Sequence, residues 1–367
     1  AGITAKSSIA GGKIHLANGK PTGLLVDNAM SLVEEFIPTF SEQDIISAVI
    51  DIQEELFSYG ITGVHEAGIE FDQIAFLKNI IDNNDFQLNI YAMLMATDEN
   101  IDFAKKNGIF SYKNLSIRSF KVMADGALGS RGALLKRPYK DDHGHNGLQV
   151  SDVKTMRKVA LLALDLDYQM NTHCIGDSAN ALVLELYRKV NEVKKDHRFR
   201  IEHAQIIDPK DFSKFSSYGV LPSVQPTHAV SDQRWVENRI GKDRLKGAYA
   251  HSKLLKTCGM IAIGTDFPVE LTNPFLTIHA AVQRKNADDM PIEGFLKSEA
   301  LSLEETLKGM TIWAAYAAFQ EKERGTLEVG KMADFAIFQK PVVSRPNFES
   351  NFSWMTFVSG KKVYVAE

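Results

Sequence analysis

From about residue 41 onward, segments with the hydrophobic spacing of helices alternate with short apolar runs typical of β-strands. The helix expected over 41–60 begins at Ser41, a capping residue with Asp44 placed for a capping box, and it ends at a glycine. Strict alternation of helices and strands favours parallel strands joined by right-handed crossovers. Most of the chain is therefore expected to form one α/β unit with a parallel sheet.

Seven strands are expected, each preceded by a helical segment. They cover residues 61–67, 86–94, 117–125, 168–175, 198–205, 220–226 and 260–266. The longer helical segments among and after them are 71–85, 152–167, 178–193, 239–259 and 301–319. A chain of 367 residues suits one large barrel with an appendage. We therefore predict a (β/α)8 TIM-like barrel that lacks its first strand.

The two ends of the chain have a different pattern from the middle. Residues 1–40 predict a small hairpin around the turn Asn18-Gly19, which we interpret as an excursion on the catalytic side of the barrel. The C-terminal part is rich in turns and short β segments, including a final strand pair around a Ser-Gly turn. We assign residues 1–320 to the barrel and 321–367 to a small β-sandwich remnant.

Four polar residues stand near the ends of expected strands: Lys121, His173, His203 and Asp266. The carboxyl ends of barrel strands meet at one face, so these side chains are expected to converge there. Imidazole and carboxylate groups suit zinc and related divalent ions. Asp266 is also placed to act as a general base and acid. The sequence thus predicts a centre for a divalent metal, with zinc as the expected ion and one or two ions bound.

Lys121 fits a metal site only in a modified form, because an ammonium group repels cations. A buried lysine loses its proton readily, and the neutral amine could add carbon dioxide to give an anionic carbamate ligand. The same amine could instead form a Schiff base with a carbonyl substrate. An ordinary solvated or ion-paired lysine is the third interpretation.

Six segments resemble motifs of the amidohydrolase superfamily, in particular its YtcJ-like branch: SFKVMADGALGSRGALL, THCIGDSAN, RIEHAQ, QPTHAVSD, GTDFPVE and GTLEVGKMADFAIF. The resemblance covers nearly the whole chain and implies a metal-dependent barrel flanked by a small β-sandwich. It also implies hydrolysis of amide or other non-peptide C–N bonds by a metal-activated water. By position, Lys121 matches the family's carboxylated lysine, His173 and His203 match metal ligands, and Asp266 matches a metal ligand and general base.

One family feature has no counterpart at its expected place. The family carries a His-x-His on strand one, whereas the His143-Gly144-His145 of this chain lies in a polar, turn-rich loop. The sequence therefore leaves open a truncated or catalytically silent barrel without a competent metal centre. The Schiff-base enzyme that uses Lys121 remains a second alternative.

Four further residues are candidates for binding substrate: His65, Asp125, Arg131 and His228. His65 is expected near the end of its strand, facing the same mouth, although a hydrogen bond to Glu66 would also explain it. Asp125 and Arg131 fall in the loop after the 117–125 strand, where a loop ion pair is an equal alternative. His228 follows the 220–226 strand and is expected to contact substrate.

Charge and hydropathy argue against nucleic-acid and membrane partners, so a small-molecule substrate is the expected partner. The net charge of −4 and the pI of about 6.2 leave no basic footprint for nucleic acid. No apolar stretch reaches membrane-spanning length. Cys174 and Cys258 cannot make a disulfide framework, which favours a reducing, cytoplasmic location. Because residue 1 is not Met, the sequence leaves export open, and it also leaves open a homo-oligomer.

Overall fold

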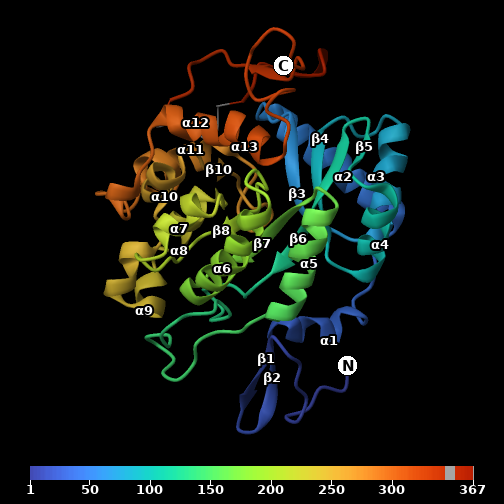
Figure 1. Ribbon diagram of the computed structural model, residues 1–367. Coiled ribbons are helices and arrows are strands. Elements are labelled where there is room, and N and C mark those ends of the chain that lie inside the picture. Colours follow the sequence, from blue (N-terminus) through green and yellow to red (C-terminus); the bar gives the residue numbers. More distant parts are fainter. Residues whose placement is uncertain (344–351, 367) are drawn as a thin grey trace.

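A curled parallel sheet forms the centre of the computed structural model, which describes residues 1–343 and 352–366 (Figure 1). The strands follow the order β10-β9-β8-β7-β6-β4-β3, with every neighbouring pair parallel. They are β3 (Gly63–Ile69), β4 (Asn89–Met95), β6 (Leu115–Met123), β7 (Gln169–Cys174), β8 (Arg200–His203), β9 (Leu221–Val224) and β10 (Ala262–Ile263). The short β5 (Phe110–Tyr112) pairs with β6 in the antiparallel direction. The predicted seven-stranded α/β sheet is confirmed.

The sheet stays open between β3 and β10, because no pairing joins these two strands within the described residues. A groove of about 300 Å³ runs beside β3 and is bordered by residues of the C-terminal helices. The fold is therefore a partial (β/α) barrel, as the prediction of a missing first strand required.

Helices surround the sheet and alternate with its strands. They are α2 (Glu42–Ser58), α3 (Phe71–Asp82), α4 (Asp98–Asn107), α5 (Val153–Asp165), α6 (Asp177–Val193), α7 (Phe212–Ser217), α8 (Pro226–Asp232), α9 (Val236–Ile240), α10 (His251–Cys258), α11 (Pro274–Gln283), α12 (Leu303–Met310) and α13 (Ile312–Ala317). Helix α2 begins with the predicted capping box of Ser41 and Asp44. On α6, Val183, Tyr187 and Val190 recur at helical spacing and are buried against the sheet.

Two expected helices are interrupted. Residues 239–259 comprise the end of α9, the 3-10 helix η2 (Lys242–Gly247) and α10, with 248–250 outside any helix. There the backbone N–H of Tyr249 donates to the carbonyl of Gln205 at 2.8 Å, which is a long-range bond that a continuous helix would prevent. The 301–319 segment divides at Thr311, whose non-helical backbone (φ −126°, ψ −94°) separates α12 from α13.

The N-terminal hairpin lies at the end of the sheet opposite the C-terminal strands (Figure 1). It consists of β1 (Gly12–Ala17) and β2 (Lys20–Asp27), and Asn18 and Gly19 both have positive φ, as the predicted turn requires. The short η1 (Asn28–Met30) and α1 (Ser31–Glu34) follow. Contacts to the loop after β6 include Lys13 with Asp142 at 3.8 Å. The hairpin is therefore attached to a loop that leaves the carboxyl end of the sheet.

A three-stranded antiparallel sheet closes the described chain. It contains β11 (Phe335–Ile337), β12 (Met355–Val358) and β13 (Lys361–Val365). Thr356 donates its hydroxyl to the carbonyl of Phe57 at 2.6 Å, which fixes this sheet to the end of α2. Residues 344–351 and 367 of the predicted 321–367 segment lie outside the described residues.

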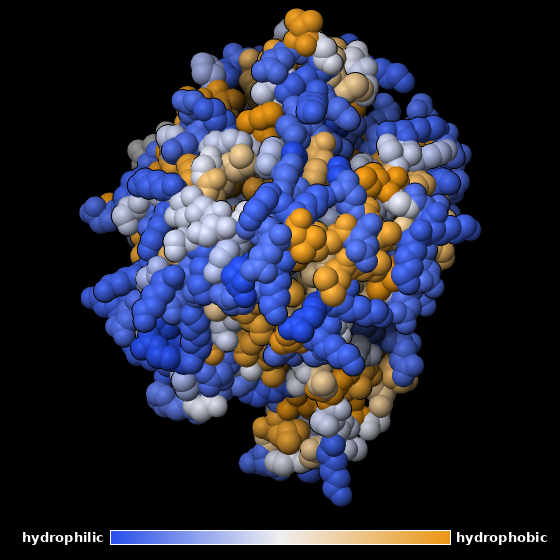
Figure 2. Space-filling model, viewed as in Figure 1, coloured by the Kyte–Doolittle hydropathy of each residue, from blue (hydrophilic) through white to orange (hydrophobic). Residues whose placement is uncertain are grey.

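Most of the surface in the same view is hydrophilic, and apolar side chains gather at the hairpin end (Figure 2). Exposed apolar residues of the first forty positions are Leu16, Leu24, Met30, Phe36, Ile37 and Phe40. The described helices include none with both the length and the apolar character needed to span a bilayer.

Candidate metal centre

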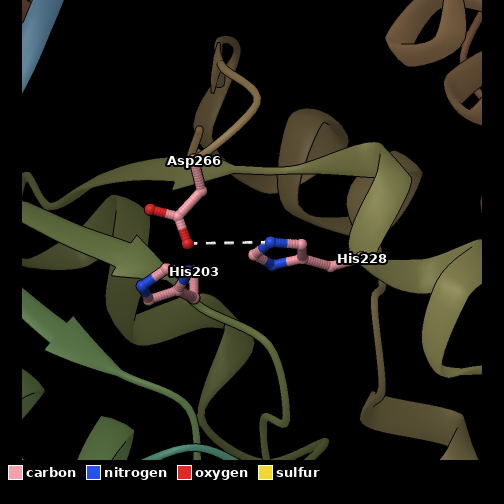
Figure 3. Close-up of side chains that lie close together, drawn as sticks. All are labelled: His203, His228 and Asp266. Carbon is pink, nitrogen blue, oxygen red and sulfur yellow. Dashed lines mark ion pairs between the residues drawn. The ribbon is translucent and has the colours of Figure 1, made fainter. Parts of the chain in front are cut away.

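Three side chains from successive βα units converge at the carboxyl end of the sheet (Figure 3). His203 is the last residue of β8, His228 lies in α8 just after β9, and Asp266 follows β10 by three residues. One possible ligand atom from each lies within 4.8 Å of the others. The barrel topology thus brings together residues that are up to 63 positions apart in the sequence.

The backbone at this centre departs from ordinary strand geometry. His203 has φ 74° and Asp266 has φ 63°, in the left-handed region that non-glycine residues rarely adopt. Such conformations cost on the order of 1–3 kcal/mol each and cluster at functional sites. At His203 the left-handed backbone also breaks the alternation of faces along β8, which carries Arg200 and Glu202 on one face. The convergence is therefore held in place against a local conformational cost.

Gln225 fixes the orientation of the His203 ring. Its side-chain oxygen accepts a hydrogen bond from Nδ1 of His203 at 2.8 Å. Because this oxygen can only accept, Nδ1 carries the proton and the lone pair of Nε2 remains available for an ion. Burial, followed by the neighbouring His173, lowers the pKa of His203 well below its usual value, so the ring is neutral at neutral pH.

His228 and Asp266 face each other across the same space. Nε2 of His228 lies 3.6 Å from Oδ2 of Asp266, and this nitrogen is buried without a hydrogen-bond partner in the described chain. Burial lowers the pKa of His228 to about 4 and raises the pKa of Asp266 to about 6, with Lys121 opposing the second shift. At neutral pH the pair is therefore a neutral nitrogen donor beside an ionised carboxylate.

His173 adjoins this group from β7. Its ring packs edge-on against His203, with 4.6 Å between the centroids. Its Nε2 is buried without a hydrogen bond and lies 3.7 Å from Oδ1 of Asp125. Burial lowers the pKa of His173 to about 3, and contact with the Gly126 backbone acts in the opposite direction. Buried polar atoms are normally satisfied, so these unpaired nitrogens fit a site that is completed by a cation.

Lys121 lies deeper in the sheet than the histidines. On β6 it pairs in register with Asn171, whereas Met123 pairs with His173. The side chain is buried, and burial lowers the pKa of its amine, opposed by Glu202 and then by Asp266. No ion pair of Lys121 occurs within the described residues. The structure therefore places a desolvated amine near the candidate centre.

Asp125 and Arg131 are both engaged within the loop after β6. Asp125 is fully buried and accepts backbone N–H groups of Leu134, Ile175 and Gly176 at 2.8–3.0 Å. Burial raises its pKa to about 7. Arg131 donates two hydrogen bonds to the carboxylate of Asp141, at 3.2 and 3.0 Å. Asp125 thereby ties this loop to the end of β7.

His65 lies below the mouth of the partial barrel. Strand β3 continues to Ile69, four residues beyond His65, and the ring Nδ1 is 3.0 Å from the guanidinium of Arg200. Arg200 is itself fully buried, and its Nε lies 3.3 Å from Glu202. The expectation that His65 stands near the strand end was wrong because the strand is longer than its apolar run.

The sequence analysis gave Gln225 no role, and it assigned His228 to substrate binding rather than to the group of possible metal ligands. The available signal was the Gln-Pro-Thr-His segment directly after a strand. A proline at the first helical position favours a helix start there, and α8 does begin at Pro226. This places Gln225 beside β8 and directs His228 toward the sheet.

Comparison with known proteins gives a consistent result. The model of the amidohydrolase family matches residues 1–364. YtcJ of Bacillus subtilis (strain 168) is 32% identical over 328 residues, covering 88% of this chain and 61% of the relative. Protein LONG AFTER FAR-RED 3 of Arabidopsis thaliana is 31% identical over 384 residues, covering 97% of this chain and 64% of that relative. The chain thus spans less than two thirds of the length of both relatives.

Solved structures share the same fold. An uncharacterized metal-dependent hydrolase from Pyrococcus furiosus has a TM-score of 0.71 at 28% identity, over 83% of this chain and 61% of that one. A second one, from Pyrococcus horikoshii OT3, has a TM-score of 0.78 at 24% identity, over 92% and 69%. Atrazine chlorohydrolase TrzN from Arthrobacter aurescens TC1, solved with zinc, has a TM-score of 0.58 at 13% identity, over 89% and 73%.

Proposed function

The chain belongs to the amidohydrolase family. We propose that it acts as a metal-dependent hydrolase on amide or other non-peptide C–N bonds. The observation that carries this proposal is the convergence of His203, His228 and Asp266 within 4.8 Å. Two neutral imidazoles and one carboxylate are a common donor set for a divalent ion, and zinc is our proposed ion. His173, whose ring packs on His203, is the proposed fourth ligand.

The residues of the chain divide the chemistry between them. A divalent ion held by His203, His228 and Asp266 would supply Lewis-acid chemistry, which polarises a carbonyl and lowers the pKa of a water molecule. Asp266 would accept the proton of the attacking water and return it to the leaving nitrogen. In the metal-free chain burial raises the pKa of its carboxyl to about 6, so the group is ionised at neutral pH. Gln225 keeps Nε2 of His203 free to bind the ion. We propose that Lys121, as a carbamate, supplies an oxygen ligand when a second ion is present.

Apolar side chains beside Asp266 favour a substrate with an apolar part. Phe267, Val269 and Leu271 follow Asp266 directly and are 50%, 71% and 68% exposed. Their exposure at the mouth provides a surface for an acyl or alkyl portion of an amide. His228, which the sequence predicts to contact substrate, is proposed here as a metal ligand because it lies 3.6 Å from Asp266. We propose that Asp125, Arg131 and His65 affect substrate binding indirectly, through the loop after β6 and the barrel floor.

Two alternatives have their own supporting observations. The open edge between β3 and β10 in the described chain favours a silent barrel that binds a ligand without turning it over. The buried amine of Lys121 favours a Schiff-base enzyme, because burial lowers its pKa. Borohydride trapping of a carbonyl substrate on Lys121 would support the second alternative and would count against a carbamate.

The deciding experiment compares zinc-loaded and chelator-treated protein on a panel of N-acyl amides. We expect amide cleavage that requires zinc and is lost in Asp266→Asn but kept in His143→Gln, which changes an exposed histidine outside the proposed ligand set. Bound zinc without cleavage would favour the silent barrel. A protein that takes up no divalent ion would overturn the proposal.

A further inference from the structure

Asp27, the last residue of β2, places its carboxylate between two glycines of the loop after β6. A side chain at either Gly126 or Gly132 would collide with this carboxylate. Its Oδ2 is shielded from solvent and has no hydrogen-bond partner in the described chain. The ion pairs of the described residues also leave Asp27 without a basic partner. Asp27 is half-buried, so its carboxylate has one oxygen that neither water nor a counter-charge satisfies in the described chain.

The backbone at Asp27 is unusual as well. Its φ of 52° and ψ of −130° fall in a region that residues with a side chain rarely occupy. The neighbouring Asn28 helps to hold this conformation, since its side-chain amide donates to the carbonyl of Ala10 at 2.9 Å and approaches that of Val150 at 3.5 Å. The hairpin therefore holds Asp27 in a strained conformation against the β6 loop.

The cradle adjoins the candidate metal centre. Gly126 contacts the carboxylate of Asp27, and its backbone also contacts the ring of His173. His173 in turn packs on His203 with 4.6 Å between the ring centroids. Asp27 is therefore separated from the histidines by a single glycine of the loop, although it belongs to a hairpin outside the barrel.

A group that would satisfy this carboxylate must be positively charged and able to donate hydrogen bonds. Ammonium, amidinium and guanidinium groups meet both requirements and form the strongest hydrogen bonds to carboxylates. Asp125, a carboxylate close enough to interact with Asp27, already accepts three backbone N–H groups, so it offers a metal ion little further coordination. These observations favour an organic cation over an inorganic one.

We propose that Asp27 recognises a positively charged group of the substrate, so that the preferred substrates are amides with an ammonium, amidinium or guanidinium near the scissile bond. This inference rests on the proposed hydrolase function. It also gives the N-terminal hairpin a role in specificity, because the hairpin brings Asp27 to the edge of the site.

Binding can be tested without catalysis. Isothermal titration would compare n-butylguanidinium with the neutral isostere n-butylurea, on zinc-loaded and on metal-free protein. We expect the wild type to bind the cation at least tenfold more tightly than the urea, and Asp27→Asn to lose this preference. The matched control is Asp142→Asn, which removes another carboxylate between the hairpin and the same loop and is expected to keep the preference. Equal binding of the two compounds by the wild type, or a preference that survives Asp27→Asn, would overturn the inference.

Measurements of catalysis and stability distinguish a role of Asp27 in substrate recognition from a structural or metal-binding role. For paired N-acyl substrates with and without a guanidinium, Asp27→Asn should reduce the ratio of kcat/KM values at least tenfold. If the wild type hydrolyses both substrates with equal kcat/KM, this inference is wrong but the proposed function stands. If the wild type prefers the cation in binding but hydrolyses neither substrate, the proposed function is wrong but this inference stands. Because Asp27→Asn removes a carboxylate without a partner, its melting temperature should equal or exceed that of the wild type. A lower melting temperature, or the loss of one bound zinc, would instead assign Asp27 a structural or metal-binding role.

Discussion

Nε2 of His228 lies 3.6 Å from Oδ2 of Asp266, although one residue sits in a helix after β9 and the other in the loop after β10. Burial gives the two groups opposite pKa shifts, so a neutral nitrogen faces a carboxylate at neutral pH. Because Nε2 of His228 has no hydrogen-bond partner in the described chain, the two groups can share a cation.

Replacing Asp266 by Asn should abolish most of the proposed activity. The substitution removes the proton acceptor, which is typically worth 10²–10⁴-fold in rate, and it removes one anionic ligand. We expect kcat/KM on the best amide substrate to fall by at least about 100-fold, with zinc content measured on the same samples. Activity within a few-fold of the wild type would show that Asp266 is not the base.

Replacing Gln225 by Met should weaken zinc binding without unfolding the chain. The hydrogen bond at 2.8 Å from Nδ1 of His203 selects the tautomer whose Nε2 is free, and loss of such outer partners commonly costs about 10–100-fold in metal affinity. Competition with a chromophoric chelator would measure the change. Gln225→Glu keeps an acceptor and should retain most of the affinity, so equal losses in both variants would contradict this role.

The metal-free protein should show a pH-dependent contribution from His228. Its folded-state pKa of about 4 lies below the usual value of 6.5, so the unfolded chain binds more protons between these pH values. The stability associated with the neutral ring is present above pH 6.5 and is lost as the pH falls toward 4. Relative to the wild type, His228→Gln should therefore gain up to about 1.4 kcal/mol of stability per pH unit as the pH falls from 6.5 to about 4. Urea denaturation in the presence of a chelator measures this difference, and a constant difference across this range would contradict the prediction.

Asp125→Ala should destabilise the fold whether or not substrate is present. The substitution leaves three buried backbone N–H groups without an acceptor, at about 1–3 kcal/mol each. We expect the free energy of unfolding to fall by about 3 kcal/mol or more, measured by urea denaturation. Asp141→Asn, in the same loop but paired with arginine side chains, is the control and should have a smaller effect. Full stability of Asp125→Ala with impaired substrate binding would restore a direct role in binding.

The sequence was sufficient to predict the parallel sheet because helices and strands are indicated by patterns among residues that are neighbours in the chain. Alternating helical and strand-like segments dictate parallel strands, and Asn18-Gly19 dictates the hairpin turn. The interruption at residues 248–250 could not be predicted, since it depends on a bond between Tyr249 and the distant Gln205. Long-range partners of this kind leave no periodic signal.

The candidate site was predictable only in part, for the same reason. His203 and Asp266 stand where apolar runs end, and their convergence follows from barrel topology. The place of His228 depends on how α8 packs, and the orientation of His203 depends on Gln225, 22 positions away. The role suggested for Asp27 depends on contact between a hairpin and a loop about a hundred positions apart, which spacing alone could not indicate.

The most direct test of the shared centre is a zinc titration of the metal-free chain, compared with His203→Gln, His228→Gln and the control His143→Gln. We predict at least one tightly bound zinc in the wild type and in the control, and a loss of affinity of at least about tenfold when either buried histidine is replaced. Equal zinc binding by all four proteins, or none by the wild type, would contradict the assignment of His203, His228 and Asp266 to one metal centre.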